Sequence, residues 1–568
     1  MSVTIPKIKN VCCVGAGYVG GPSSTILALK VPDIDVTVVD KSVPRVEAWN
    51  SDQLPFSEPG LLEAVQGARG VKSQLTSDDA HISERRPNLF FSTDVDETIR
   101  KADLIFVAVE TPSGKRDGLG NGAAPNLTSF HAVLKHIAKT VEHDFILVNK
   151  STVPCGSADA ARNIIAPYLQ PGIKFQVLSN PEFLAEGTAV SDLTHPDRII
   201  IGCDESKEGF AAANALADLY ARWVSPEKIV TLNSRASELS KLAANALLAQ
   251  RISSINALSA ICDKIGADIT QVSSACGLDK RIGKHMLRST LGFGGSCFEK
   301  DVLHLTNTAA TLGLPDVASY LESIVGINTY QTDRFTQNIM SRVPSSPIGR
   351  RTVLGILGFA FKPDTDDTRS SPAIPVIRDL IIAGYQVKIY DPLVEEEKIR
   401  QDLSASLPQG EHVIDAQVSV VKNVYEACDG ANGIAILNSW KDLRYVPIRR
   451  DSGYSTPIPD LDIKKNDISM PTTIDAKQID WQRIADRMHS PMYVFDGHNI
   501  LDPRLTELGF CIDGVGRPVL LPGQGSASKV GEEPANDAPS VKTEVADISV
   551  ADISVGELTT PITPLIAV

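Results

Sequence analysis

Residues 11–40, VCCVGAGYVGGPSSTILALKVPDIDVTVVD, decide the fold of the first part of this chain. An apolar run ends at Gly15, a glycine-rich turn follows, and a helical stretch leads into a second apolar run that Asp40 closes. A strand, a helix and a second strand in this order build a parallel sheet. The turn places Gly15, Gly17 and Gly20 where backbone amides and a helix N-terminus can approach a pyrophosphate. With Asp40 twenty residues beyond the turn, the pattern predicts a Rossmann-type domain that binds a dinucleotide.

Asp40 also indicates which dinucleotide binds. A carboxylate here accepts hydrogen bonds from the adenosine ribose and would repel a 2′-phosphate, so Asp40 favours NAD over NADP. Arg45, five residues on, is a cation near the same place and keeps NADP open as an alternative. A merely tight turn would explain the glycines but not Asp40.

Further apolar runs continue the alternation through about the first 210 residues. They are residues 89–92, 104–109, 145–149, 175–179 and 199–202, and helix-length spacers separate them. We therefore expect one doubly wound sheet here.

Polar segments follow three of these strands. They are Glu110-Thr111-Pro112, Ser151-Thr152-Val153-Pro154 and Asn180-Pro181-Glu182. Ligands bind beyond the carboxyl ends of parallel strands, so Thr152 and Glu182 should converge near the nicotinamide. The alternative is that each side chain caps the helix that follows it.

The rest of the chain predicts a helical linker, a second α/β lobe and a tail. Residues 234–276 have helical periodicity and lack glycine until Gly266, and strands are expected near 353–357, 387–390, 433–437 and 493–495. The predicted class is α/β, with two Rossmann-like doubly wound parallel-sheet domains joined by a long central helix. The predicted domains are 1–233, 234–345 and 346–521, with polar insertions near 68–87 and 446–470. Residues 522–568 form an acidic, disordered tail, for which partner binding is the alternative.

Composition excludes several classes of protein. A formal net charge of −14 argues against a protein that binds the nucleic-acid backbone. No uncharged apolar run is long enough to span a bilayer and the N-terminus lacks a signal peptide, so we expect a cytoplasmic protein without a membrane partner. The nine cysteines have neither the spacing of a disulfide framework nor a CxxC metal site, which predicts free thiols and no metal.

One cysteine stands where a helix should begin, in GFGGSCFEKD at 292–301. Ser296 with Glu299 three residues later predicts a capping box, which puts Cys297 at the first helical position. The helix dipole there favours the thiolate, and Asp301 lies one turn further along the same face. This pair indicates covalent catalysis; a buried structural cysteine is the alternative.

Several cations are candidates for binding an anionic substrate. Lys241 and Asn245 share a face of the long helix, although Lys241 could simply be solvated there. Phe361 and Lys362 follow the first strand of the second lobe. Arg281 and Arg369 lie in predicted loops and could clamp a diphosphate.

Six segments together resemble the UDP-glucose dehydrogenase family, of the eukaryotic type. They are GAGYVGG, KSTVP, SNPEFLAEGTA, ELSKLAANALLAQRISSINALSA, GFGGSCFEKD and FAFKPDT, and the resemblance covers residues 8–515. It implies two successive NAD-linked oxidations that convert UDP-glucose into UDP-glucuronate. Cys297 would form a thiohemiacetal and then a thioester, which water hydrolyses.

The resemblance also implies a role for each candidate residue. Lys241 and Asn245 would stabilise oxyanion charge, Asp301 and Glu182 would handle protons and water, and Thr152 would position a water. The implied UDP-sugar site comprises Glu182, Phe183, Leu184, Glu186, Lys241, Asn245, Arg281, Phe293, Gly294, Phe361, Lys362 and His498. The implied NAD contacts are Gly15, Gly17, Tyr18, Val19, Gly20, Asp40, Arg45, Thr111, Thr152, Glu186, Lys300 and Arg369. Arg281 would reach across a subunit interface in a homo-oligomer that is at least a dimer, and the resemblance is compatible with a hexamer.

The chain departs from the family at His498, where members usually carry an arginine after FDG. Histidine cannot make a bidentate phosphate contact, which puts that part of the substrate clamp in question. Two alternatives stay open. One is a dehydrogenase for another nucleotide sugar, GDP-mannose or a UDP-N-acetyl amino sugar; the other is an inactive regulatory relative that binds NAD and UDP-sugar.

Overall fold

The structure is a computed structural model, and it describes residues 7–70, 86–112, 124–345, 351–407, 411–443 and 479–523. The predicted insertion at 446–470 lies outside the described residues, as do most of the insertion at 68–87 and nearly all of the tail. Every candidate site residue lies inside them.

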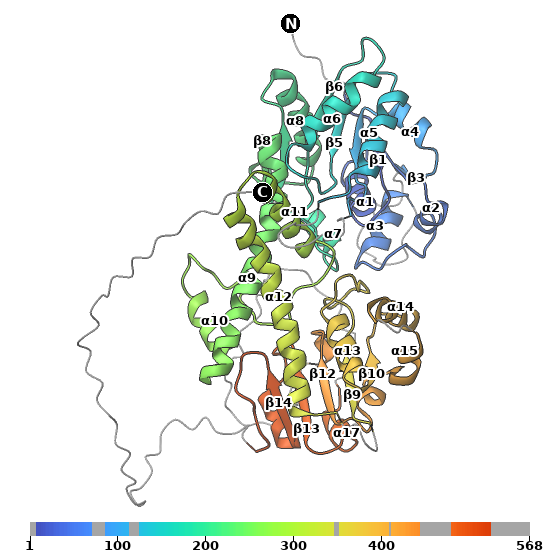
Figure 1. Ribbon diagram of the computed structural model, residues 1–568. Coiled ribbons are helices and arrows are strands. Elements are labelled where there is room, and N and C mark those ends of the chain that lie inside the picture. Colours follow the sequence, from blue (N-terminus) through green and yellow to red (C-terminus); the bar gives the residue numbers. More distant parts are fainter. Residues whose placement is uncertain are drawn as a thin grey trace, which may run out of the picture. The chain divides into compact units, whose positions relative to one another are not determined.

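Within the described residues, the N-terminal sheet has eight strands in the order β3-β2-β1-β4-β5-β6-β7-β8 (Figure 1). They are β1 (Asn10–Val14), β2 (Asp35–Val39), β3 (Leu89–Ser92), β4 (Leu104–Val107), β5 (Phe145–Asn149), β6 (Phe175–Ser179), β7 (Ile199–Cys203) and β8 (Ile229–Asn233). Neighbouring strands are parallel except β6 and β7. The order reverses between β1 and β4, which is where a doubly wound sheet binds its ligand.

Helices cover both faces of this sheet and form two separate cores. Those packed on one face are α1 (Gly20–Lys30), α2 (Val43–Trp49), α3 (Leu61–Ala68) and α8 (Lys207–Tyr220), and those on the other are α4 (Val95–Lys101), α5 (Thr128–Thr140) and α6 (Ser157–Ile165). A short helix, α7 (Ala189–Thr194), precedes β7. Successive residues of a strand point to opposite faces, so Cys12 and Cys13 enter different cores.

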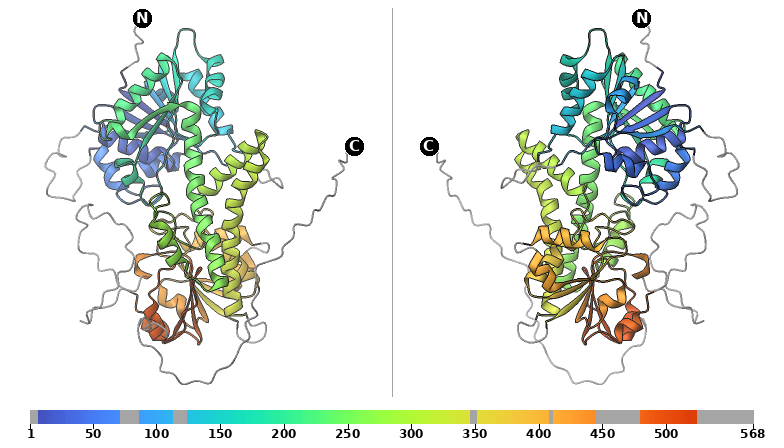
Figure 2. Two further views of the ribbon diagram at one scale, coloured as in Figure 1. Left: turned by 90° about the vertical axis from the view of Figure 1, so that its left-hand side faces the viewer. Right: turned by 90° about the vertical axis from the view of Figure 1, so that its right-hand side faces the viewer.

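Four helices form the central region. They are α9 (Ser234–Ile265), α10 (Ile269–Gly277), α11 (Phe298–Thr311) and α12 (Pro315–Arg342). Ala249 of α9, Leu303 of α11 and Val325 of α12 belong to one buried cluster. Figure 2 shows the long green helix α9 beside the yellow-green helix α12. The predicted helix up to residue 276 was wrong at its end, because Gly266 adopts a left-handed conformation with φ of 75° and stops α9. No helix in the described parts of the chain is both long and apolar enough to cross a membrane.

The C-terminal lobe repeats the parallel order of the first sheet, β11-β10-β9-β12-β13-β14. Its strands are β9 (Val353–Leu357), β10 (Gln386–Tyr390), β11 (Val418–Val420), β12 (Gly433–Ile436), β13 (Met492–Asp496) and β14 (Phe510–Gly514). One face packs against α12, α13 (Ala373–Ile382), α14 (Glu396–Ser406) and α15 (Glu411–Gln417), and the other packs against α16 (Val424–Cys428) and α17 (Trp481–Ala485). Four of these six strands are predicted from the sequence, and β11 and β14 are not.

Candidate active site

The turn between β1 and α1 fits a dinucleotide pyrophosphate. Gly15 has φ of 111°, and a Cβ there would lie 2.4 Å from the carbonyl oxygen of Ala108. A Cβ on Gly20 would lie 1.9 Å from the carbonyl oxygen of Gly15, whereas a Cβ on Gly17 would meet nothing within 4 Å. The first and third glycines therefore make the turn tight, and the second leaves open space beside its backbone.

Asp40 faces this turn from the end of β2. Its carboxylate accepts hydrogen bonds from the backbone N–H of Ala16 at 3.0 Å and of Ser42 at 2.9 Å. The Arg45 guanidinium lies 3.3 Å away and is partly exposed. The carboxylate is thus held beside the turn, at the place where a ribose hydroxyl needs an acceptor.

Glu58 joins the glycine turn to the loop after β6. It accepts hydrogen bonds from the Tyr18 hydroxyl and from the backbone N–H groups of Gly187 at 2.8 Å and Ala189 at 2.6 Å. Burial, followed by this bond to Glu58, raises the pKa of Tyr18 well above its usual value. Glu58 is not among the residues predicted from the sequence, because 129 residues separate it from Gly187.

Cys297 lies at the start of α11, at the positive end of the helix dipole. The predicted capping box was wrong: α11 begins at Phe298, Cys297 is its N-cap, and no side-chain hydrogen bond caps this helix among the described residues. The Ser296 hydroxyl instead lies 3.6 Å from the Cys297 sulfur. The thiol is half-buried.

Two glycines bring the cysteine loop against the C-terminal lobe. A Cβ on Gly294 would lie 2.6 Å from the carbonyl oxygen of Ser370, and one on Gly295 would lie 2.9 Å from the ring of Phe361. The Gly295 N–H also donates to the carbonyl oxygen of Arg369 at 2.9 Å. Only glycine permits this close approach, so the nucleophile loop and the second lobe meet at backbone distance.

Asp301 is fully buried one turn along α11 from Cys297. The Asn245 amide of α9 donates to one of its carboxylate oxygens at 2.6 Å. The other oxygen has no hydrogen-bond partner among the described residues. Burial raises the pKa of Asp301 despite the opposing charges of Lys300 and Lys241, so this carboxyl can hold and release a proton.

Lys241 and Thr152 line a small hollow together with Glu182. The hollow has a volume of about 10 Å³, which is close to the space that one water occupies. The Lys241 ammonium lies 5.4 Å from the centre of the Phe183 ring, and the Arg198 guanidinium lies 4.0 Å from the same centre. The predicted convergence of Thr152 and Glu182 is therefore present, with Lys241 beside them.

Comparisons with known proteins agree with this geometry. The UDP-glucose/GDP-mannose dehydrogenase family matches in three parts: its NAD binding domain at residues 9–224, its central domain at 235–330 and its UDP binding domain at 355–458. The chain belongs to this family.

Individual dehydrogenases of the family match nearly the whole chain. UDP-glucose 6-dehydrogenase 4 of Arabidopsis thaliana and UDP-glucose 6-dehydrogenase 5 of Oryza sativa subsp. japonica are each 44% identical over 520 residues, which cover 90% of this chain and 97% of each relative. A solved UDP-glucose dehydrogenase from the archaeon Pyrobaculum islandicum superposes with a TM-score of 0.69 at 27% identity, over 91% of this chain and 100% of that one. The predictions of family, fold class and an NAD-linked dehydrogenase are confirmed.

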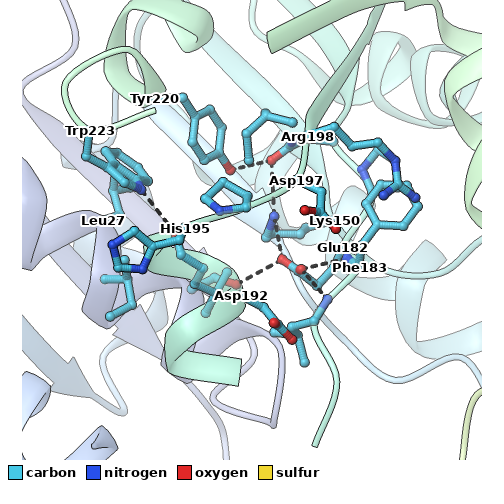
Figure 3. A pocket seen from close by; sticks show the side chains of 18 of the residues that line it. Leu27, Lys150, Glu182, Phe183, Asp192, His195, Asp197, Arg198, Tyr220 and Trp223 are labelled. Carbon is cyan, nitrogen blue, oxygen red and sulfur yellow. Dashed lines mark hydrogen bonds and ion pairs between the residues drawn. The ribbon is translucent and has the colours of Figure 1, made fainter. Parts of the chain in front are cut away.

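Glu182 of this dehydrogenase has a buried partner that the sequence analysis did not single out. The Lys150 ammonium lies 3.1 Å from its carboxylate, and the backbone N–H groups of Phe183 and Leu184 donate to its other oxygen at 2.6 and 2.8 Å (Figure 3). Burial pushes the pKa of Glu182 upward, but the charge of Lys150 and these hydrogen bonds outweigh it and lower the pKa. Lys150 could have been predicted from the sequence, because it directly follows a buried strand and stands two residues before Thr152.

The predicted anion-binding cations of the dehydrogenase fall into two groups. Lys362 and Arg369 approach Glu186 at 4.0 and 3.7 Å, which joins the C-terminal lobe to the loop after β6. Arg281 is 89% exposed and pairs with Asp279 at 2.6 Å, away from the other predicted contacts.

His498 is held in the C-terminal lobe by hydrogen bonds of both its ring and its backbone. The ring Nε2 of His498 lies 3.1 Å from the carbonyl oxygen of Leu437, and the Arg288 guanidinium donates to the backbone carbonyl oxygen of His498 at 2.7 Å. Burial lowers the pKa of His498 to about 4, so its ring is uncharged at neutral pH. In this family member the position does not supply the cation that an arginine would.

Proposed function

We propose that this protein oxidises C6 of UDP-glucose to a carboxylate in two NAD-linked steps and so produces UDP-glucuronate. Each oxidation removes one hydride and one proton from the substrate, and one water supplies the second carboxylate oxygen. The observation that carries the proposal is Cys297 at the start of α11, one turn from the buried Asp301–Asn245 pair. The 44% identity to plant UDP-glucose 6-dehydrogenases supports this substrate over other nucleotide sugars.

NAD would be held by the glycine turn and Asp40, and when bound it supplies the hydride acceptor. The further contacts we propose are Tyr18, Val19, Arg45, Thr111, Thr152, Glu186, Lys300 and Arg369. Asp40 is held by two backbone N–H groups, which supports NAD over NADP.

Different side chains would carry the separate steps of the covalent reaction. The Cys297 sulfur adds to the aldehyde carbon while the carbonyl oxygen gains a proton, and Lys241 and Asn245 offer donors to that oxygen. The second oxidation removes a hydride from the carbon and a proton from the hydroxyl of this thiohemiacetal, which leaves a thioester. Water then adds to the thioester, the carbon–sulfur bond breaks and sulfur leaves as a thiolate. Asp301, with its raised pKa, is suited to take the proton of that water, which Thr152 would position.

Substrate binding would involve both lobes. Phe183, Leu184, Glu186, Phe293, Gly294, Phe361 and Lys362 would surround the UDP-sugar, with Lys362 and Arg369 as cations close to the loop after β6. We assign cofactor binding to residues 1–233, the nucleophile to 234–345 and the nucleotide of the substrate to 346–521.

We propose that the enzyme is at least a homodimer and that a second copy covers α9. Leu247, Leu258, Ile261 and Ile265 are 63%, 42%, 55% and 71% exposed. At 100° per residue around the helix axis, the other three side chains point within about 40° of the direction of Leu247. This is the pattern of a helix that packs against a partner. Arg281 and His498 stay proposed substrate contacts, Arg281 by reaching a neighbouring subunit. All nine cysteines are free, which supports a cytoplasmic location.

The test is to supply purified protein with NAD and one nucleotide sugar and to count NADH per sugar consumed. We expect two NADH per UDP-glucose. One NADH per sugar would overturn the two-step reaction, activity with GDP-mannose alone would overturn the substrate, and no turnover would favour an inactive binding protein.

Cys297→Ser tests the nucleophile. We expect net acid formation to be lost while calorimetry still detects UDP-glucose binding. Cys276→Ser, which changes an exposed thiol elsewhere in the central region, should behave as wild type. Undiminished turnover in Cys297→Ser would exclude covalent catalysis at this sulfur.

A further inference from the structure

Lys150 occupies an unusual place for a lysine. Its side chain is only 5% exposed, at the end of β5, and it lies 5.9 Å from the centre of the Phe106 ring of β4. A buried ammonium is costly unless its donors are used. Lys150 uses them on Glu182 at 3.1 Å and on the amide oxygen of Asn180 at 3.1 Å.

Asn180 cannot rotate away from Lys150. Its amide nitrogen donates to the carbonyl oxygen of Ile200 at 2.8 Å, which fixes its orientation. The hydroxyl of the buried Tyr220, on α8, donates to the same amide oxygen as Lys150 at 2.6 Å. Strand β7 and helix α8 thus determine where the ammonium stands.

The carboxylate of Glu182 is saturated with donors. Lys150 and the Ser23 hydroxyl, at 3.4 Å, lie at one oxygen, and two backbone N–H groups lie at the other. An ionised carboxylate has about four acceptor sites, so a proton on either oxygen would displace a donor. This arrangement suits a fixed negative charge and not a group that takes up and releases protons.

A cavity of about 480 Å³ lies behind this pair, and Figure 3 shows Lys150 and Glu182 in its wall. The small hollow with Thr152 and Lys241 adjoins this cavity, since Lys150, Pro181 and Glu182 line both spaces. Glu182 therefore borders both the cavity and the hollow that Thr152 and Lys241 line. Without Lys150, this carboxylate oxygen would keep only the Ser23 hydroxyl, at 3.4 Å, as a donor among the described residues.

We propose that Lys150, itself held by Asn180 and Tyr220, is a positioning residue that fixes the Glu182 carboxylate beside Lys241. The inference rests on the UDP-glucose oxidation proposed above. In it, Asp301 exchanges protons, and Glu182 presents a permanent charge that orients Lys241 toward the substrate oxygen.

The test compares Lys150→Met, Lys150→Arg and Lys228→Met. Lys228 lines the same cavity but is exposed, and it serves as the control. We expect Lys150→Met to lower kcat by about 10- to 100-fold at pH 7 with a smaller change in KM. The acid limb of the pH–rate profile of this variant should move to higher pH, because Glu182 would stay buried but would lose the ammonium that stabilises its charge. Lys150→Arg should recover part of the rate, and Lys228→Met should match wild type.

The acid limb must be assigned against the other ionisable groups around Glu182. Besides Lys150, those that face it or line its cavity are Cys13 on β1, Lys241 and Glu238 on α9, Tyr220 on α8, Asp192 on α7, His195, Asp197 and Arg198 before β7, and Lys228 before β8. A double-mutant cycle makes the assignment: Lys150→Met should add less than about threefold to the loss already caused by Glu182→Gln.

Several outcomes would overturn the proposal. One is that Lys150→Met leaves both kcat and the acid limb of the pH–rate profile unchanged. Another is that Lys150→Met lowers kcat by the same factor in the Glu182→Gln enzyme as in wild type. If Lys150→Met does not fold, Tyr220→Phe must still move the limb in the same direction, and an unmoved limb would count against the network. If the wild-type protein has no activity, the proposed function fails, but the Lys150–Glu182 interaction can still be tested by thermal unfolding. Strictly additive effects of Lys150→Met and Glu182→Gln on stability would then show that the two side chains do not interact.

Discussion

Gly17 and Gly20 lie in one turn but meet different requirements. A Cβ at Gly20 would overlap the backbone oxygen of Gly15, whereas a Cβ at Gly17 would enter open space. We expect Gly20→Ala to lower the free energy of unfolding by about 2–3 kcal/mol, since backbone cannot yield as a side-chain tip does. Gly17→Ala should fold with wild-type stability but bind NAD about tenfold more weakly, because its methyl group occupies the pyrophosphate's place.

Thermal unfolding and NAD titration of the two variants check this prediction. The two effects should separate, with stability lost in one variant and affinity in the other. Equal NAD affinity in Gly17→Ala and wild type would place the pyrophosphate elsewhere.

His498 should make stability depend on pH. Its folded pKa of about 4 lies below the usual 6.5, so the unfolded chain binds its proton first as pH falls. Stability from this residue is thus complete above about pH 6.5 and declines toward pH 4, by about 2 kcal/mol between pH 7 and pH 5. His498→Gln can still donate to Leu437 but does not titrate, and its unfolding midpoint should fall less over this range. Parallel curves for the two proteins would show that the ring is already charged when folded.

At the scale of elements, Glu238 ties the long helix α9 to the start of α6. Its carboxylate accepts hydrogen bonds from the backbone N–H groups of Gly156 at 2.6 Å and Ala158 at 2.7 Å, just after the loop that carries Thr152. We expect Glu238→Ala to lower the free energy of unfolding by about 2 kcal/mol, because two donors at a helix N-terminus lose their acceptor. Glu238→Gln keeps one acceptor oxygen, so its denaturant unfolding midpoint should lie between those of Glu238→Ala and wild type. Identical midpoints for Gln and Ala would contradict this role.

Both errors about helices concern where an element begins or ends. Helical periodicity continues through Gly266, but a left-handed glycine stops α9 and lets α10 start in a new direction. Likewise, the Ser296–Glu299 spacing predicts a cap, but α11 begins one residue later, at Phe298, after a loop in which Gly294 and Gly295 contact the second lobe. Local patterns identify the elements, and tertiary contacts adjust their ends.

For the molecule as a whole, the apolar face of α9 predicts assembly. We expect Leu247→Glu to shift the protein toward monomer in size-exclusion chromatography with light scattering, since a buried charge at a helix pair is strongly unfavourable. Ile382→Glu is the matched control, because Ile382 has the same 63% exposure but lies on α13 of the C-terminal lobe. An unchanged mass for Leu247→Glu, or a loss of assembly in both variants, would reject this face as the interface.

The sequence alone determined the features that short-range chemistry controls. Buried strands, the glycine turn and Asp40 could be read from periodicity and spacing, because strand burial and a tight turn depend on neighbouring residues. The candidate nucleophile and its carboxylate, four residues apart on one helix, were readable for the same reason.

Only the tertiary structure decided which distant residues complete the site. Glu58 reaches Gly187 across 129 residues, Glu238 reaches Gly156 across 82, and Lys150 meets Glu182 only because β5 and β6 are adjacent in the sheet. Such contacts have no sequence spacing of their own. They arise because parallel strands bring their carboxyl ends to one edge, where buried charges must find partners from whichever element lies nearest.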